Sequence, residues 1–133
     1  MINIKELSVG NWVKFPHGID KIIDLPYVEG KGVCASFAAS ATLFPVSIED
    51  LEPIEITPEI LEKNGWKFNA AMSDYVLAED YYSIIVNEVT DGLYQFKIDG
   101  EEIINTTEII HASYVHQLQN ALTLCGINKE IEL

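Results

Sequence analysis

The chain has 133 residues, of which 48% are hydrophobic and 22% are charged, so it is long and apolar enough to bury a core and is not of the disordered class. Its 21 acidic residues outnumber eight basic residues, all of them lysine, and the net charge is −13 at pH 7. Because phosphates are neutralised by basic side chains and guanine edges are read by arginine, we expect no binding to DNA or RNA.

The composition also predicts a soluble protein of the cytoplasm. No apolar run approaches the roughly 18 residues that a membrane span requires, so we expect no membrane association. The N-terminal residues include the charged pair Lys5 and Glu6 in place of the apolar segment of a signal peptide. The two cysteines, Cys34 and Cys125, lie far apart without metal-like spacing, and we expect them to be free, reduced thiols.

Residues 1–56 are expected to form a small β subdomain. Val13 and Phe15 alternate on one face of a first strand, and the following Pro16-His17-Gly18 supplies a reversal. In the second strand, spacing by two residues predicts one apolar face made of Ile19, Ile23 and Leu25.

Further short strands at regular spacing indicate a curled sheet. They are expected at residues 32–37, 43–46 and 53–54, with a helical turn at residues 47–51. A turn just before the last strand is typical of a Src-homology-3-like or Tudor-like barrel, an architecture that serves unrelated functions and so predicts none. The small residues at 35–42 are interpreted as a loop or tightly packed strand, or alternatively as a place where a ligand approaches the backbone.

Residues 57–133 are expected to form the second subdomain, either separate from the first or part of one compact unit. Thr57 is a natural N-cap, Pro58 suits the first helical position, and Asn64-Gly65 ends this short helix. Strands follow in an antiparallel meander, with a strong hairpin signal at Asp91-Gly92. They are expected at residues 66–68, 75–77, 81–89, 94–98 and 101–104.

A last helix is expected between an N-cap at Ser113 and a terminating Gly126. Its apolar stripe comprises Tyr114, Leu118, Ala121, Leu122 and Cys125. We expect this stripe to pack on the meander face formed by Tyr82, Ile84, Val86, Tyr94, Phe96 and Ile98. The sequence therefore predicts an α+β fold in which a C-terminal helix covers one face of a meander.

Three stretches occur in the order LSVGNWV (residues 7–13), PIEITPEILEKNG (53–65) and YVHQLQN (114–120). Together they resemble a family of short proteins without an assigned activity, encoded in the genomes, phages and mobile elements of anaerobic gut bacteria. The resemblance runs from residue 7 to about residue 126, and the last stretch is its most specific part. It implies no substrate or catalytic residues and favours a cytoplasmic accessory protein of mobile-element origin.

The sequence contains no recognisable catalytic or cofactor signature, and we predict no catalytic, metal-binding or cofactor-binding residues. His111 is expected on a strand and His116 on the following helix, so their spacing matches no helical ligand pair, and His17 is remote in sequence. His116 and Cys125 would lie on opposite sides of the helix. Nucleophile elbows, metalloprotease motifs and phosphate loops are not found.

Five residues are candidates for a partner surface, and each also has a structural interpretation. Trp12 and Trp66 are either exposed anchors or half-buried core residues. Either His116, Gln119 and Asn120 form one recognition face of the last helix, or the Gln and Asn side chains bond to nearby loop or strand backbone and fix the helix on the sheet.

Three functions follow from these alternatives. The leading hypothesis is a non-enzymatic interaction module that binds another protein through its barrel or helix face. Self-association through an exposed sheet edge or the region of Trp66 is compatible with it. The second is DNA mimicry by residues 51–133, where 15 acidic residues stand against four lysines. It requires that acids such as the following share one face: Glu52, Glu55, Glu59, Glu62, Asp91, Glu101 and Glu102. The third is a small enzyme whose site forms only in the folded chain.

Overall fold

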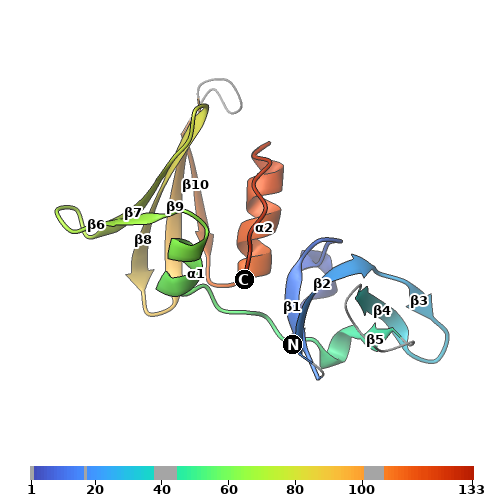
Figure 1. Ribbon diagram of the computed structural model, residues 1–133. Helices are drawn as coiled ribbons and strands as arrows, with labels where there is room; N and C mark the ends of the chain where they lie inside the picture. Colours follow the sequence, from blue (N-terminus) through green and yellow to red (C-terminus); the bar gives the residue numbers. More distant parts are fainter. Residues whose placement is uncertain (1, 17, 38–44, 101–106) are drawn as a thin grey trace. The chain divides into compact units, whose positions relative to one another are not determined.

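The computed structural model describes residues 2–16, 18–37, 45–100 and 107–133. The chain divides into two compact units: unit 1 comprises residues 1–54 and 114–116, and unit 2 comprises residues 55–113 and 117–133. Each unit contains an antiparallel sheet, and the predicted α+β class is confirmed (Figure 1). The assignment of residues 114–116 to unit 1 has no counterpart in the sequence analysis.

Unit 1 is built from short strands and two 3₁₀ helices. These elements are η1 (Ile4–Glu6), β1 (Trp12–Phe15), β2 (Gly18–Asp24), β3 (Tyr27–Val28), β4 (Gly32–Phe37), β5 (Val46–Ser47) and η2 (Ile48–Asp50). The strand order is β1-β2-β4-β3, with β5 also paired to β4. After η2, Glu52 exchanges two backbone hydrogen bonds with Lys14 of β1, with N···O distances of 2.9 and 2.8 Å. Between the described strands of this unit, no closed barrel is found.

The buried face of β2 differs from the predicted one. Ile22 is 1% exposed, whereas Ile19 and Ile23 are 50% and 51% exposed. The β1–β2 turn fixes a register in which residues 18 and 20 lie opposite the buried Phe15 and Val13, so Ile22 continues the buried face. A β-bulge between residues 22 and 24 then interrupts the alternation along the strand.

Aromatic stacking lies at the centre of the unit 1 core. The rings of Phe15 and Phe37 are 4.3 Å apart between centroids and nearly parallel, at 9°. The other buried members of the cluster are Ile2, Leu7, Val13, Ile22, Ala35 and Leu51. The predicted strand at residues 43–46 begins on residues outside the described ranges. His17 and most of the small-residue tract at 35–42 also lie outside these ranges.

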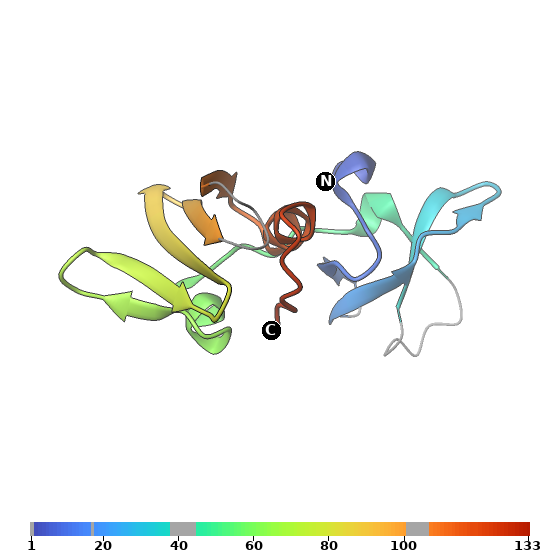
Figure 2. The ribbon, with the colours of Figure 1, turned by 90° about the horizontal axis from the view of Figure 1, so that it is seen from above.

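Unit 2 contains a five-stranded antiparallel meander and two helices. The elements are α1 (Pro58–Lys63), β6 (Lys67–Asn69), β7 (Asp74–Ala78), β8 (Tyr82–Thr90), β9 (Leu93–Gly100), β10 (Thr107–Ala112) and α2 (Val115–Leu124). The sheet order is β10-β9-β8-β7-β6, which makes β6 and β10 its edge strands. Helix α2 lies beside this sheet in both ribbon views (Figures 1 and 2). The strand expected at residues 101–104 falls outside the described residues.

Local capping explains where α1 begins and ends. Thr57 Oγ1 accepts a hydrogen bond from the Ile60 amide at 3.2 Å, which confirms the predicted N-cap. At the other end, the amide of Asn64 closes the last turn, and its side chain makes three hydrogen bonds to backbone groups of residues 60 and 132. These bonds fasten the C-terminal tail to α1.

The boundaries of α2 agree with the prediction at one end only. Gly126 has a φ of +76°, and the Ile127 amide bonds to the Leu122 carbonyl, an arrangement that only a left-handed residue at 126 permits without strain. At the start, helical residues begin at Val115, so Ser113 is not the N-cap. Its amide instead donates to Gln117 Oε1 at 3.0 Å.

Candidate protein-binding surface

One row of side chains crosses the inner face of the unit 2 sheet, the face toward α2. Cross-strand pairing aligns five residues in the order Phe68, Tyr75, Val86, Phe96 and Ile110. Val86 and Phe96 in the middle of the row are fully buried, whereas Phe68 on the edge strand β6 is 55% exposed. The apolar row that forms part of the unit 2 core therefore ends in a solvent-exposed side chain at the edge strand β6.

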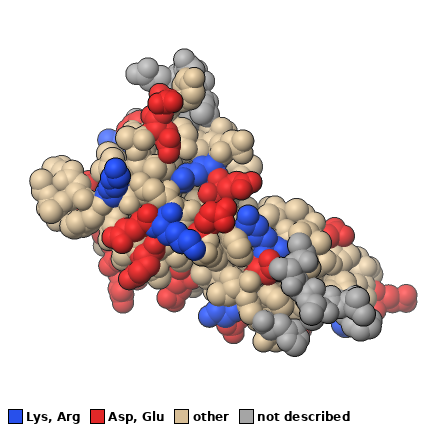
Figure 3. Space-filling model, in the orientation of Figure 1, with Lys and Arg blue, Asp and Glu red and all other residues tan. Residues whose placement is uncertain are grey.

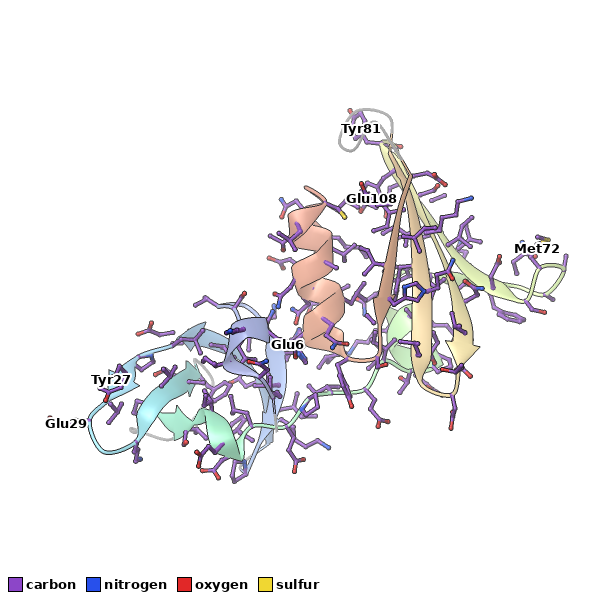
Figure 4. All side chains as sticks on the ribbon, turned by 180° about the vertical axis from the view of Figure 1, so that it is seen from behind. Glu6, Tyr27, Glu29, Met72, Tyr81 and Glu108 are labelled. Carbon is purple, nitrogen blue, oxygen red and sulfur yellow. The ribbon has the colours of Figure 1, made fainter. Side chains whose placement is uncertain are left out.

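The turn after β6 adds a second exposed apolar residue. Met72 is 71% exposed and lies in the turn between β6 and β7, which extends away from the rest of the sheet (Figure 4). The rings of Phe68 and Tyr75 are in contact, with centroids 5.2 Å apart and a tilt of 58°. Asn69 Oδ1 accepts a hydrogen bond from the Ala71 amide at 3.1 Å, which holds the turn in place. We call Phe68, Met72 and Tyr75 the hairpin surface.

Carboxylates lie beside the hairpin surface. Burial, a side-chain hydrogen bond to Glu88, and the nearby charges of Glu88, Tyr75 and Glu59 raise the pKa of Tyr94 to about 12. Tyr94 is therefore protonated at neutral pH, and its hydroxyl donates a hydrogen bond to the exposed Glu88 carboxylate. At neutral pH this hydroxyl therefore acts as a hydrogen-bond donor and not as a base.

The pKa values of Cys125 and His116 are shifted in opposite directions. Burial and the nearby Glu108 raise the pKa of the Cys125 thiol, so little thiolate forms at neutral pH. Figure 4 shows Glu108 on the side of β10 that faces α2. In unit 1, burial lowers the pKa of His116, an effect that Glu6 opposes from 3.4 Å. The described part of the chain holds no group of three His, Cys, Asp or Glu side chains that could bind a metal ion.

Two of the candidate residues from the sequence lie in the interior. Trp66 is 2% exposed, and Phe96 meets it edge to face with centroids 6.4 Å apart. His116 is 1% exposed. In this conformation neither side chain is available to a partner. Trp66 is a core residue, and the partner of His116 is the Glu6 carboxylate, 3.4 Å from Nε2.

The other three candidates are partly accessible. Trp12 is half-buried, with Lys21 Nζ 5.1 Å from the centre of its ring. Gln119 and Asn120 are half-buried on α2. Because His116 is buried, these three helix residues do not form the single exposed face that their spacing suggested. The hairpin surface was not predicted from the sequence, where its one signal is that residues 68–73 carry no charge within an acidic region.

The acidic residues are spread over several elements. Unit 2 carries 14 acidic residues against four lysines, hence a net charge of −10. Glu59 and Glu62 lie on α1, Asp91 lies in the β8–β9 turn, and Glu52 belongs to unit 1. Figure 3 shows lysine and acidic side chains next to one another on the face in view. Glu101 and Glu102 lie outside the described residues.

Comparison with known proteins finds no matching protein family, no similar curated protein and no similar solved structure. Among the helices of the described residues, none has the length and apolar character needed to cross a membrane.

Proposed function

We propose that this protein is a non-enzymatic interaction module that binds another protein through the hairpin surface. The observation that carries the proposal is the 55% exposure of Phe68 at the end of a row whose central residues are fully buried. Apolar area left in water costs free energy, and aromatic residues and methionine are enriched in protein interfaces. A partner that covers Phe68 and Met72 would complete the burial of this row.

The titratable groups support a binding role over an enzymatic one. Burial shifts the pKa values of the Tyr94 hydroxyl and the Cys125 thiol upward, so neither group is activated beyond an ordinary tyrosine or cysteine. A nucleophile or base needs the opposite shift or an adjacent activating group.

DNA mimicry is the weaker alternative. A mimic needs carboxylates in regular rows on one surface, whereas the outer face of the unit 2 sheet has a central row of lysine and apolar residues. The members of this row, in cross-strand order, are Lys67, Val76, Ile85, Lys97 and Ile109.

We also propose that unit 1 is a small barrel of the Src-homology-3-like or Tudor-like kind. The strand order supports this, together with the 3₁₀ helix η2 directly before the pairing of Glu52 with Lys14.

The cytoplasm as the site of action is supported by the free thiols of Cys34 and Cys125. An accessory role in a mobile element follows from the sequence resemblance alone.

Site-specific photo-cross-linking tests the proposed function. A benzophenone amino acid replaces Met72 in one variant and Tyr81 in the control. Tyr81 is 59% exposed and lies after β7, whereas Met72 lies before it, so the two residues mark opposite ends of one strand. In the native host we expect a defined protein adduct from position 72, little from position 81, and loss of the adduct when Phe68→Ser is added.

Two results would refute this function: adducts of equal yield and identity at both positions, or a position-72 adduct that survives Phe68→Ser. An adduct between two copies of the chain would identify self-association in place of a different partner. Phe68→Ser removes a half-exposed side chain together with its ring contact to Tyr75, which should cost roughly 0.5–1.5 kcal/mol of stability. Circular dichroism checks that the variant is folded.

A further inference from the structure

We propose that the segment bound by the hairpin surface is basic: an arginine- or lysine-bearing stretch of another protein, with apolar residues between its cations. The inference rests on the proposed function and adds the chemistry of the partner. It depends on the exposed aromatic ring of Phe68 and on two glutamates, Glu88 and Glu59, that lie around Tyr75 and Tyr94 in the same unit.

The positions of these glutamates follow from strand register and from their shared neighbour. Tyr75 lies opposite Val86, so Glu88, two residues further along β8, is its diagonal neighbour on the same face. Glu88 is exposed and holds the Tyr94 hydroxyl, and Glu59 in the first turn of α1 acts on that same hydroxyl. Glu88 is thus placed beside Tyr75, the inner member of the ring pair, and Glu59 lies close enough to the Tyr94 hydroxyl to act on it.

This combination favours a cation on an apolar stem. An aromatic face attracts an ammonium or guanidinium group, and a neighbouring carboxylate can pair with the same group. The positive charge of Lys67 does not compensate the glutamates, because successive side chains of a strand point to opposite faces and Lys67 belongs to the outer row. The net charge of −10 on unit 2 further attracts a basic segment and repels an acidic one.

A second copy of the chain fits this surface less well than a basic partner. The chain has no arginine, whose planar group stacks on aromatic rings and pairs with carboxylates through two hydrogen bonds. Each copy also carries a net charge of −13, so two copies repel each other at long range.

Fluorescence anisotropy with two short labelled peptides tests the inference on the full chain. One probe alternates arginine and leucine, and the other alternates serine and leucine. At near-physiological salt we expect the arginine probe to bind about tenfold more tightly or better, and we expect Glu88→Gln and Phe68→Ser each to weaken it about three- to tenfold. The matched control Glu79→Gln removes the same charge after β7, at the far end of that strand, and should change the affinity less than about twofold.

Each contrary result has a distinct meaning. Equal affinity for both probes, lost in Phe68→Ser, overturns the basic partner and leaves the proposed function standing. Equal weakening by Glu79→Gln and Glu88→Gln indicates diffuse attraction to an acidic protein and also overturns the inference, as does a lack of binding to either probe. The proposed function itself is decided by the cross-linking at position 72. If Glu88→Gln disturbs the sheet by circular dichroism, Glu59→Gln on α1 takes its place.

Discussion

Truncation of Leu118 should strongly destabilise unit 2. Leu118 is 1% exposed on α2, and Leu124, on the same helix, is 89% exposed. Burying a leucine contributes about 1.5–3 kcal/mol, and the cavity left by truncation adds a further cost. Leu118→Ala should therefore lower the free energy of unfolding by about 2–5 kcal/mol, whereas Leu124→Ala should change it by less than about 0.5 kcal/mol.

Urea unfolding followed by Trp66 fluorescence measures this difference. Trp66 is buried in unit 2 and Trp12 belongs to unit 1, so a Trp12→Phe background makes the signal report on unit 2 alone. A local signal matters because two units need not unfold in one transition. With a urea dependence of about 2 kcal/mol per molar, the Leu118→Ala midpoint should fall by roughly 1–2.5 M.

Leu124→Ala is the appropriate control because it makes the same chemical change on the same helix. Gln117 is a poorer choice, although the sequence places it on the polar side, because its side chain accepts the Ser113 amide hydrogen bond. If Leu118→Ala and Leu124→Ala unfold at the same midpoint, the sheet-facing side of α2 is misassigned, and with it the packing of the helix on the meander.

Four further predictions concern single groups. Tyr94 has a folded pKa of about 12 against about 10 unfolded, so the stability that this difference contributes is complete below pH 10 and should be lost as the pH rises toward 12. Absorbance at 295 nm should show a tyrosine that titrates near pH 12 and is absent in Tyr94→Phe; Tyr82, whose pKa is raised as well, remains in that variant. Asn64→Ala should cost about 1–3 kcal/mol and speed amide exchange in the C-terminal tail, because three hydrogen bonds are lost, whereas Asn128→Ala on the exposed part of the tail should do neither. Intact mass after alkylation in denaturant without reductant should show both Cys34 and Cys125 labelled, and an unlabelled protein would contradict the free thiols. Mobility-shift assays at micromolar protein should detect no binding to duplex DNA or RNA, and a shift that weakens with added salt would contradict the argument from charge.

Local sequence chemistry was sufficient for the ends and turns of many elements. Thr57 caps α1, the Asp91-Gly92 pair forms the β8–β9 turn, and Gly126 terminates α2, as predicted. Each of these features depends on the conformational preference of one residue and on hydrogen bonds within a few positions along the chain. Alternation also identified the buried residues of β8 and β9, because that strand pair is regular over most of its length; of the predicted set, Tyr82 alone is half-buried.

Burial at individual positions depended on contacts that the sequence does not encode locally. Ile22 is buried because pairing with β1 and a bulge against β4 set its face, and His116 is buried despite its place on the polar side of the helix pattern. Phe68 alternates with polar neighbours along β6, as Phe96 does along β9. It is nevertheless exposed, because β6 is an edge strand. Periodicity determines which side chains share a face, but only the tertiary structure determines where that face ceases to be covered, since burial depends on segments distant in sequence.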